Sequence, residues 1–433
     1  MNIYIKNIDI ITMDAQNPII KNGNIAISGN SIAYVGEGMT PPGFVPDRLI
    51  IGRNKLAMPG LVNTHAHSAM TILRNFANDL VLQEWLFDKV FPAEAQIKEN
   101  DVYWGVMLAV AEMIKSGTTS FADMYLFMDS TARAVKESGI RANLSKSPVL
   151  FDKDGDGGII DDFADCRRFH NDWNNAADGR IITSVEVHSP YLFDKPNMIK
   201  AAELAADIGS RIQIHILETA AEREEAMKKY GMSPVKLCDE CGIFNVPVIA
   251  AHCVHMSDED IDIFVERKVS VSHNPTSNLK LASGIAPIPD MMKKGINITL
   301  GTDGAASNNN LDMFNEINLA ALIHKGVNND PTLVTAEEAL KMATSNGAKA
   351  IGFDDTGSIK EGFKADIILL DTDKPHFCPM NDPLSAIVYS ANGSDVDTVI
   401  VDGEILMESR QLKSVDEERI KYEVGKISKR ILG

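Results

Sequence analysis

The stretch Leu61–Met70, "LVNTHAHSAM", places two histidines one residue apart at the end of an apolar run. Alternate residues of an extended strand lie on the same face, so His65 and His67 can both point at one ligand. Two histidines make a metal site only where other parts of the chain add further ligands. Whether His65 and His67 belong to a metal site, and to which fold, therefore depends on the residues that later segments place beside them.

Apolar, strand-like runs recur along the middle of the chain, with helix-like segments such as "TARAVKESG" between them. After the first run come "TTSFADMY", "ANLSKSPVL", "IITSVEVHS", "RIQIHILE", "VPVIAAHC", "VSVSHNP" and "NITLGTDG". Eight strands that alternate with helices over this length predict a (β/α)8 barrel, a TIM barrel of the α/β class. A doubly wound open sheet is the alternative, but the glycine fingerprint that many such sheets carry after the first strand is missing.

The two ends of the chain have a different pattern, with short strands separated by turns. Residues 1–57 contain the turn signal Asn22-Gly23, and residues 358–433 contain the hairpin signal Asp402-Gly403. Neither end is large enough to close a core alone, so we expect the two to pack together. A helix from about Val415 to Leu432 is expected to close the chain.

Composition bounds the class of protein. The 433 residues are 45% hydrophobic and 24% charged, which is ordinary for a globular protein, and no apolar run approaches a membrane span. A net charge of −18 disfavours binding to nucleic acid. The first residues lack the pattern of a signal peptide, and five cysteines at irregular spacing argue against a disulfide framework. We therefore expect a cytoplasmic protein without a membrane anchor.

Ionisable residues close the predicted strands. Six of the ten histidines occur at this one kind of position, and an aspartate closes the last strand. These residues are His65, His67, His188, His215, His252, His273 and Asp303. The carboxyl ends of barrel strands form the face on which active sites are built, so a shared structural accident is a poor explanation.

The chemistry of these residues indicates a metal site. His65, His67, His215 and Asp303 would supply three nitrogens and one oxygen, with room left for water. Zinc suits this set best, and iron or manganese are alternatives. Such an ion lowers the pKa of its water to about 7 and so generates a nucleophile at neutral pH.

Two further residues are predicted to act on protons and charge. Glu218, three residues after His215, is placed to carry a proton to the leaving group or to a ring nitrogen. His252 can steady the attacking group and the charge that develops. We predict Glu218, His252 and Asp303 as the catalytic residues.

Several linked motifs resemble a known family. "PGLVNTHAH", "HILET", "AAHCVH", "VSHNPTSNLKLASGIAP" and "LGTDGAASNNNLD" are similar to the amidohydrolase superfamily, and more narrowly to the methylthioadenosine / S-adenosylhomocysteine deaminase family. The likeness runs from about residue 3 to residue 410. It implies a barrel domain over residues 58–357 and a composite β-sandwich domain built from residues 1–57 and 358–433.

The resemblance also implies substrate contacts and the number of metal ions. Trp85, Glu94, His188 and Glu218 fall on the family's substrate-binding positions, and the Glu94 carboxylate is expected to hold the ribose hydroxyls. His188 stands where binuclear members of the superfamily have a bridging lysine. One divalent metal ion per subunit is therefore expected.

This chain departs from the family pattern at one point. Members that accept S-adenosylhomocysteine can use two arginines to grip its carboxylate, whereas Lys146 stands at the first position and Ile159 near the second. Lysine keeps the charge but loses the two-pronged geometry. We therefore expect 5′-methylthioadenosine, 5′-deoxyadenosine or adenosine to be better substrates than S-adenosylhomocysteine.

The predicted function is hydrolytic deamination of an adenine nucleoside to its inosine analogue and ammonia, by a monomer or a homo-oligomer. One alternative is another aminated or chlorinated N-heterocycle, of the guanine, cytosine or triazine type. A second alternative is a non-catalytic relative of the barrel, although no predicted ligand is missing here.

A last motif resembles the start of a calcium-binding loop. "DKDGDG", from Asp152, matches the start of such a loop, and Asp152–Asp156 would supply the first ligands. Phe163 occupies the twelfth position, where a bidentate glutamate belongs. An acidic surface turn is therefore favoured.

Overall fold

The strand-like runs of the middle of the chain form one parallel sheet. A computed structural model describes residues 1–38, 40, 42–80, 84–151 and 159–433. Within them, the spatial order of eight parallel strands follows their order in the chain. The strands are β6 (Leu61–Ala66), β7 (Thr118–Met124), β8 (Arg141–Lys146), β11 (Ile181–Val187), β12 (Arg211–Ile216), β13 (Val248–His252), β14 (Ser270–His273) and β15 (Asn297–Leu300).

This order distinguishes the two predicted topologies. A doubly wound sheet reverses its strand order at a switch point, whereas here each strand lies beside the next one along the chain. Every residue of β6, β7 and β13 is buried, as expected of parallel strands whose two faces are both covered. The predicted (β/α)8 barrel is confirmed.

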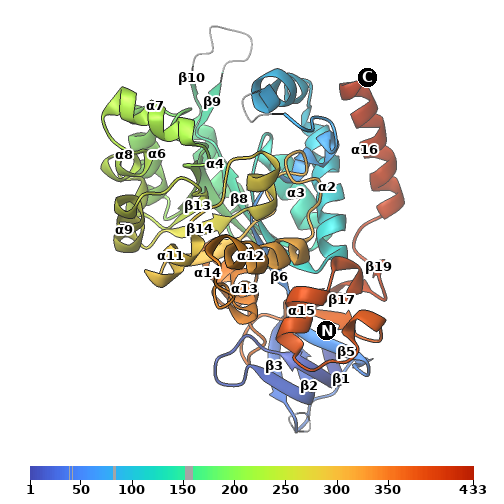
Figure 1. Ribbon diagram of the computed structural model, residues 1–433. Helices are drawn as coiled ribbons and strands as arrows, with labels where there is room; N and C mark the ends of the chain where they lie inside the picture. Colours follow the sequence, from blue (N-terminus) through green and yellow to red (C-terminus); the bar gives the residue numbers. More distant parts are fainter. Residues whose placement is uncertain (39, 41, 81–83, 152–158) are drawn as a thin grey trace.

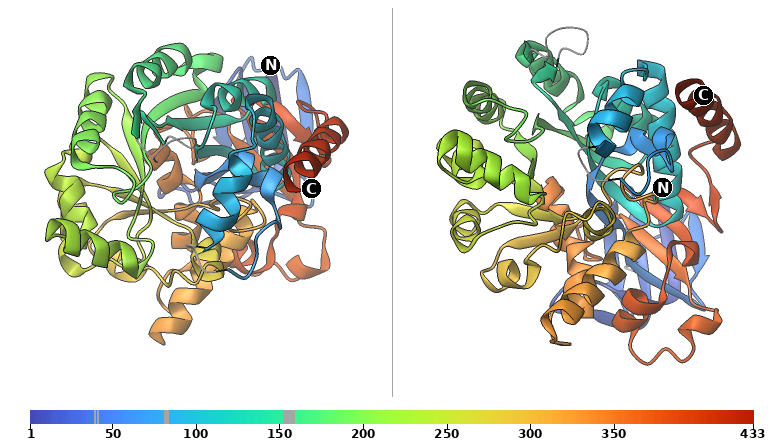
Figure 2. Two further views of the ribbon diagram at one scale, coloured as in Figure 1. Left: turned by 90° about the horizontal axis from the view of Figure 1, so that it is seen from above. Right: turned by 45° about the horizontal axis from the view of Figure 1, so that its top comes forward.

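Helices surround the barrel, as the view along it shows (Figures 1 and 2). One of them, α3, ends where the sequence predicts, because Gly139 takes the left-handed conformation (φ 84°) that glycine adopts without strain. The helices are α2 (Glu99–Lys115), α3 (Met128–Ser138), α4 (Phe163–Trp173), α6 (Lys195–Asp207), α7 (Ala220–Tyr230), α8 (Pro234–Glu240), α9 (Asp258–Arg267), α10 (Pro275–Lys280), α11 (Ile288–Lys293), α12 (Met313–Asn328), α13 (Ala336–Met342) and α14 (Ser345–Ile351).

Both ends of the chain contribute to a second, mixed sheet. Its order is β19-β18-β17-β16-β5-β1-β2-β3, with β4 paired to β1. The strands are β1 (Asn2–Ile11), β2 (Ile19–Ser28), β3 (Ser31–Gly36), β4 (Arg48–Ile51), β5 (Lys55–Pro59), β16 (Ile367–Asp371), β17 (Val396–Val401), β18 (Glu404–Glu408) and β19 (Gln411–Leu412). The expectation that the two ends pack together is confirmed, and the boundaries at residues 57/58 and 357/358 stay a prediction.

The remaining elements are short, apart from the last helix. The predicted closing helix is α16 (Glu417–Leu432), whose buried Ile420, Val424, Ile427 and Ile431 face α2 at helical spacing. The others are η1 (Ser68–Leu73), η2 (Glu84–Val90), α1 (Phe91–Glu94), β9 (Val149–Phe151), β10 (Ile159–Asp161), α5 (Ala176–Gly179), η3 (Ile243–Asn245), η4 (Pro375–Phe377), α15 (Pro383–Ser390) and η5 (Gly393–Asp395).

Two sequence predictions concern membranes and calcium. Among the described helices, none is both long and apolar enough to cross a bilayer. The predicted acidic turn at Asp152–Asp156 lies outside the described residues.

A buried arginine joins the barrel to the terminal sheet. Arg141, at the start of β8, donates from Nε to Asp366 Oδ2 at 2.8 Å and from Nη2 to Asp366 Oδ1 at 3.0 Å. Nη2 also donates to Asp402 Oδ1 at 3.1 Å. Burial opposes the charge on Arg141, but the two carboxylates outweigh it and raise the arginine's pKa. The two sheets therefore share a buried ion cluster.

Removing one partner of this cluster should destabilise the whole chain. For Asp366→Ala we expect the free energy of unfolding to fall by about 3–5 kcal/mol, because Arg141 keeps a buried charge without its main partner. Chemical and thermal denaturation measure this. Glu408→Ala, which breaks the exposed pair with Arg48, is the control, with an expected loss of about 0–1 kcal/mol. Equal losses in the two variants would contradict the prediction.

Candidate metal centre

The four predicted metal ligands meet at one end of the barrel. His67 Nε2 lies 3.3 Å from Asp303 Oδ1 and 3.2 Å from His215 Nε2. His65 Nε2 lies 3.6 Å from the same Asp303 oxygen. Candidate ligand atoms of His65, His67 and Asp303 all lie within 4.8 Å of one another. The structure therefore brings together residues that are far apart in the sequence.

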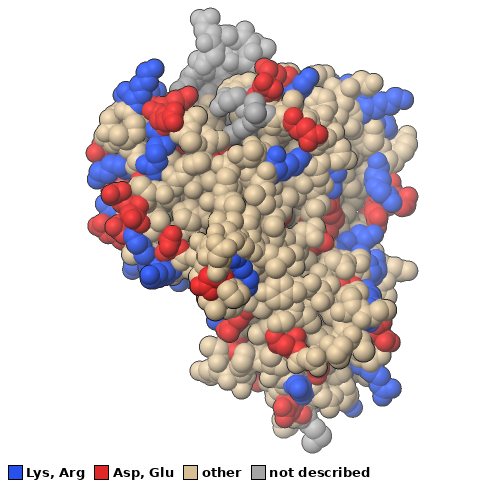
Figure 3. Space-filling view, viewed as in Figure 1, with Lys and Arg blue, Asp and Glu red and all other residues tan. Residues whose placement is uncertain are grey.

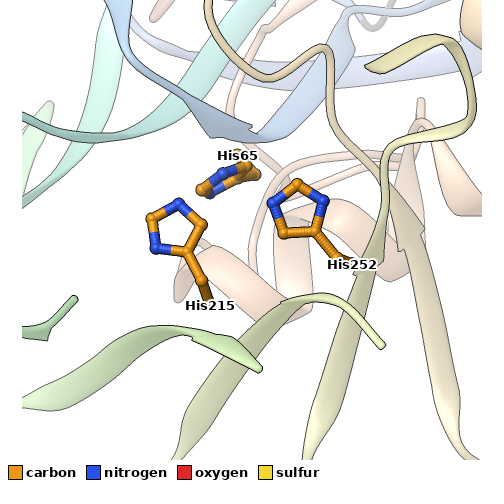
Figure 4. A group of neighbouring side chains, drawn as sticks. All are labelled: His65, His215 and His252. Atoms are coloured by element: carbon orange, nitrogen blue, oxygen red, sulfur yellow. The ribbon is translucent and has the colours of Figure 1, made fainter. Parts of the chain in front are cut away.

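A fifth residue, His252, joins the cluster. His65, His215 and His252 form a second group whose candidate ligand atoms lie within 4.8 Å of one another. Figure 4 shows their rings approaching one another from three separate strands. His252 (φ 72°) and Asp303 (φ 61°) both take the left-handed conformation, which is uncommon for residues other than glycine. Such backbone strain is concentrated at functional sites.

The outer nitrogens of two predicted ligands, His67 and His215, are held by main-chain carbonyls. His67 Nδ1 donates to Met124 O at 2.6 Å, and His215 Nδ1 donates to His188 O at 2.8 Å. A proton on Nδ1 leaves the Nε2 lone pair of each ring facing the cluster. This is the arrangement in which a histidine binds a metal.

An unpaired nitrogen tests whether the residues fit a metal. His65 Nε2 is buried and makes no hydrogen bond to any described part of the chain. A buried polar atom without a partner is costly, and a metal ion would satisfy it. Together with the nitrogens of His67 and His215 and the Asp303 carboxylate, it gives the donor set that zinc prefers. The residues present fit a divalent metal ion.

The electrostatics of the cluster favour the ligand forms of these groups. Burial lowers the pKa of His65 to about 4 and that of His215 well below its usual value. Burial alone would raise the pKa of Asp303, but the neighbouring imidazoles of His65 and His67 hold it well below the usual range. These shifts favour the neutral imidazoles of His65 and His215 and the ionised carboxylate of Asp303.

The two predicted proton-handling residues lie side by side. Glu218 Oε2 is 3.7 Å from His252 Nε2, while Ser283 Oγ donates to Glu218 Oε1 at 3.2 Å. Burial raises the pKa of Glu218. Burial lowers the pKa of His252, but Glu218 and Asp303 outweigh it, so that this pKa is raised. A glutamate and a histidine, both with raised pKa values, thus lie beside each other next to the cluster.

The predicted substrate contacts are placed less uniformly. The ring of His188 lies 4.6 Å, between centroids, from that of His215. Glu94 is buried and contributes, after burial itself, to the raised pKa of Tyr125, whose ring lies 6.3 Å from that of His67. Trp85, on η2, is buried in the apolar core of the barrel. The substrate-binding roles of these residues stay predictions.

Lys146 is already engaged within the protein. Its Nζ lies 2.7 Å from Asp165 Oδ2 and 3.6 Å from Asp162 Oδ2, both at the start of α4. Ile159 pairs with Phe151 in the hairpin of β9 and β10, and its side chain is outside what the structure describes. The charge of Lys146, which stands at the first of the two arginine positions, is therefore already balanced by neighbouring carboxylates.

Sequence reasoning missed several polar partners of the cluster. Asn278 Oδ1 accepts from His252 Nδ1 at 2.9 Å, and Ser68 donates its backbone N–H and its hydroxyl to Asp123. Asp123 ends a strand-like run in the same way as the predicted ligands, and that signal could have found it. His273, predicted at a strand end without a role, has its Nε2 3.1 Å from that of His324.

Comparisons with known proteins agree with this geometry. A model of the amidohydrolase family matches residues 56–406. A 5-methylthioadenosine/S-adenosylhomocysteine deaminase of Acetivibrio thermocellus is 56% identical over 434 residues, covering 100% of both chains. A 5′-deoxyadenosine deaminase of Methanosarcina acetivorans is 48% identical and covers 97% of this chain and 96% of its own. The structure of an adenosine deaminase from Xanthomonas campestris with bound zinc superposes with a TM-score of 0.93 at 33% identity, covering 99% and 98% of the two chains.

Removing one predicted ligand should release the metal. Because losing even an outer partner of a ligand costs 10- to 100-fold in metal affinity, we expect His215→Ala to weaken zinc binding by about 100-fold or more. Metal analysis after dialysis, with zinc as the probe, measures this. His376→Ala, at a partly exposed histidine beside Asp395, is the control and should keep the metal. Equal zinc retention in the two variants would rule out His215 as a ligand.

Proposed function

The chain belongs to the amidohydrolase family, and we propose that it is a metal-dependent deaminase of adenine nucleosides. One observation carries this proposal: histidine nitrogens and the Asp303 carboxylate converge on one point, with Glu218 and His252 beside it. Full-length similarity to nucleoside deaminases supports the choice of substrate. The five free cysteines agree with action in the reducing cytoplasm.

We propose one divalent ion per subunit. Zinc is the first choice, and iron or manganese are alternatives. His65, His67, His215 and Asp303 would hold it, and His188 stands where a bridging lysine would support a second ion. When bound, the ion supplies a water molecule of lowered pKa, and hence a nucleophile, at neutral pH.

The protein's own residues handle the protons of the reaction. Water adds to C6 of the adenine ring and loses one proton to Glu218, which passes it to the ring nitrogen; burial raises the pKa of Glu218. His252 hydrogen-bonds the attacking oxygen, with its own ring fixed by Asn278. The hydroxyl proton on C6 then passes to the amino group, the C6–N bond breaks, ammonia leaves, and the inosine analogue with its C6 carbonyl remains.

The rest of the nucleoside would be held by the predicted substrate contacts. Glu94, beside Tyr125, would accept the ribose hydroxyls, and Trp85 and His188 would border the base and the sugar. These assignments, like the metal ligands, are proposals that substitution can test.

Glu218→Gln should separate metal binding from turnover. The amide keeps the size of the side chain but cannot carry the proton, so kcat should fall by about 10²- to 10⁴-fold while zinc is retained. Ammonia release and metal analysis measure the two effects. Glu224→Gln, on the exposed face of α7, is the control and should behave as wild type. Near-normal turnover of E218Q would refute the proton-transfer role.

The pairing of Lys146 predicts which nucleosides are preferred. Because Asp165 and Asp162 already neutralise the lysine, we expect poor use of a substrate that carries a carboxylate at its 5′ end. Asp165→Asn should release Lys146 and raise kcat/KM for S-adenosylhomocysteine, relative to methylthioadenosine, on the order of tenfold. Asp172→Asn is the control. Asp172 lies on the same helix and, like Asp165, forms an ion pair with Arg168, but it forms no ion pair with Lys146.

Assays of the wild type and both variants on adenosine, 5′-deoxyadenosine, methylthioadenosine and S-adenosylhomocysteine give these ratios. An unchanged preference in D165N would contradict the role of Lys146. A wild-type preference for bare guanine, cytosine or triazines would contradict the nucleoside proposal itself.

A further inference from the structure

The Asp303 carboxylate is held at both of its oxygens. Oδ1, which faces His65 and His67, accepts the backbone N–H of Gly304 at 2.7 Å. Oδ2 accepts the hydroxyls of Ser277 at 2.6 Å and Ser307 at 3.0 Å. The two serines therefore set the rotation of the carboxylate, and with it the direction in which Oδ1 points.

Neither serine lies on a barrel strand. Ser277 is in α10, and Ser307 is in the segment between β15 and α12. A short helix and a connecting segment are not held by the hydrogen bonds of the barrel sheet. They need other contacts to keep the two hydroxyls in position. Something must fix both of them relative to Asp303.

Glu316, on α12, contacts the chain neighbours of both serines and, through Asn308, is linked to the neighbour of Asp303. It is fully buried, its Oε2 accepts the backbone N–H of Thr276 at 3.2 Å, and its Oε1 accepts Asn308 Nδ2 at 2.8 Å. The same Nδ2 of Asn308 donates to Thr302 O at 2.8 Å. Thr276, Asn308 and Thr302 directly adjoin Ser277, Ser307 and Asp303 in the chain.

We propose that Glu316 is a positioning residue for Asp303, which holds the Ser277 and Ser307 hydroxyls where they orient the carboxylate. A buried carboxylate is costly where an apolar side chain of similar size would fill the space, and both of its oxygens are used on these two segments. The inference rests on the proposed metal-dependent function. Glu316 itself touches neither substrate nor metal in this account.

The test uses three kinds of change. Glu316→Gln keeps the shape but replaces one acceptor by a donor, so that Thr276 or Asn308 loses its partner. Ser277→Ala with Ser307→Ala removes the hydroxyls themselves, and a triple variant combines all three substitutions. Glu338→Gln is the matched control, because Glu338 also accepts a backbone N–H and a side-chain donor but at the exposed start of α13.

We expect E316Q and the serine double variant each to lower kcat on the order of 10- to 100-fold and to speed zinc loss to a chelator by a similar factor. KM for the nucleoside should change little, because neither change touches the substrate. The triple variant should be no worse than the serine double variant, since all three substitutions remove one constraint on Asp303. E338Q should match wild type in every measurement.

Other outcomes overturn the inference. Normal turnover and normal zinc retention in E316Q would do so, as would effects that multiply in the triple variant, because independent roles add in free energy. Should E316Q not fold, Asn308→Ala breaks the same contact, and a normal result there overturns the inference equally. A wild-type protein without zinc or deaminase activity would overturn the proposed function too, whereas an active wild type isolates the failure to Glu316.

Discussion

The seam between the first and last strands of the barrel determines whether the metal centre can form. His65 belongs to β6, His67 directly follows it and Asp303 follows β15, so three of the four predicted ligands come from the two edges that must meet. Asn63 joins them, because its Nδ2 donates to Thr302 Oγ1 at 2.7 Å and its Oδ1 accepts Thr302 N–H at 3.0 Å. One step further, Asp303 N–H donates to His65 O at 2.9 Å.

The seam also extends below the site. The Thr64 hydroxyl lies 2.7 Å from the hydroxyls of Ser272 and Thr299 and donates to Leu300 O at 2.9 Å. These groups are buried, so each must be paired with another, and only a closed barrel pairs them all. The polar residues around the histidines in "LVNTHAH" thus have a structural task that the histidines depend on.

The part that was predictable from sequence follows from the geometry of parallel strands. Carboxyl ends of adjacent parallel strands meet at one face, so polar residues that end apolar runs must converge, whatever the loops do. That reasoning brought His65, His67, His215 and Asp303 together, and the distances agree with it. It needed only the period of the strands and no knowledge of side-chain rotamers.

The part that was not predictable lies outside the strands. Glu316 reads as an ordinary helix carboxylate, and Asn278 and Ser277 belong to a short helix that follows β14. Asn278 and Ser277 are each 26 residues from their partners in the chain, and Glu316 is 40 residues from Thr276, so no local pattern encodes these contacts. The pairing of Lys146 with Asp165 is of the same kind, since only the packing of α4 against the end of β8 creates it.

The charges of the site and of its surroundings bear on selectivity. On the face seen in Figure 3, acidic and basic side chains alternate around a largely uncharged centre, so the net charge of −18 is not gathered there. Inside the barrel, a divalent ion would balance the carboxylates of Asp303 and Glu218, which suits an uncharged purine ring. The predicted metal ligands face the reacting ring, which all adenine nucleosides share. We therefore expect discrimination by the 5′ substituent to involve the end of β8, where Lys146 is already paired with Asp165.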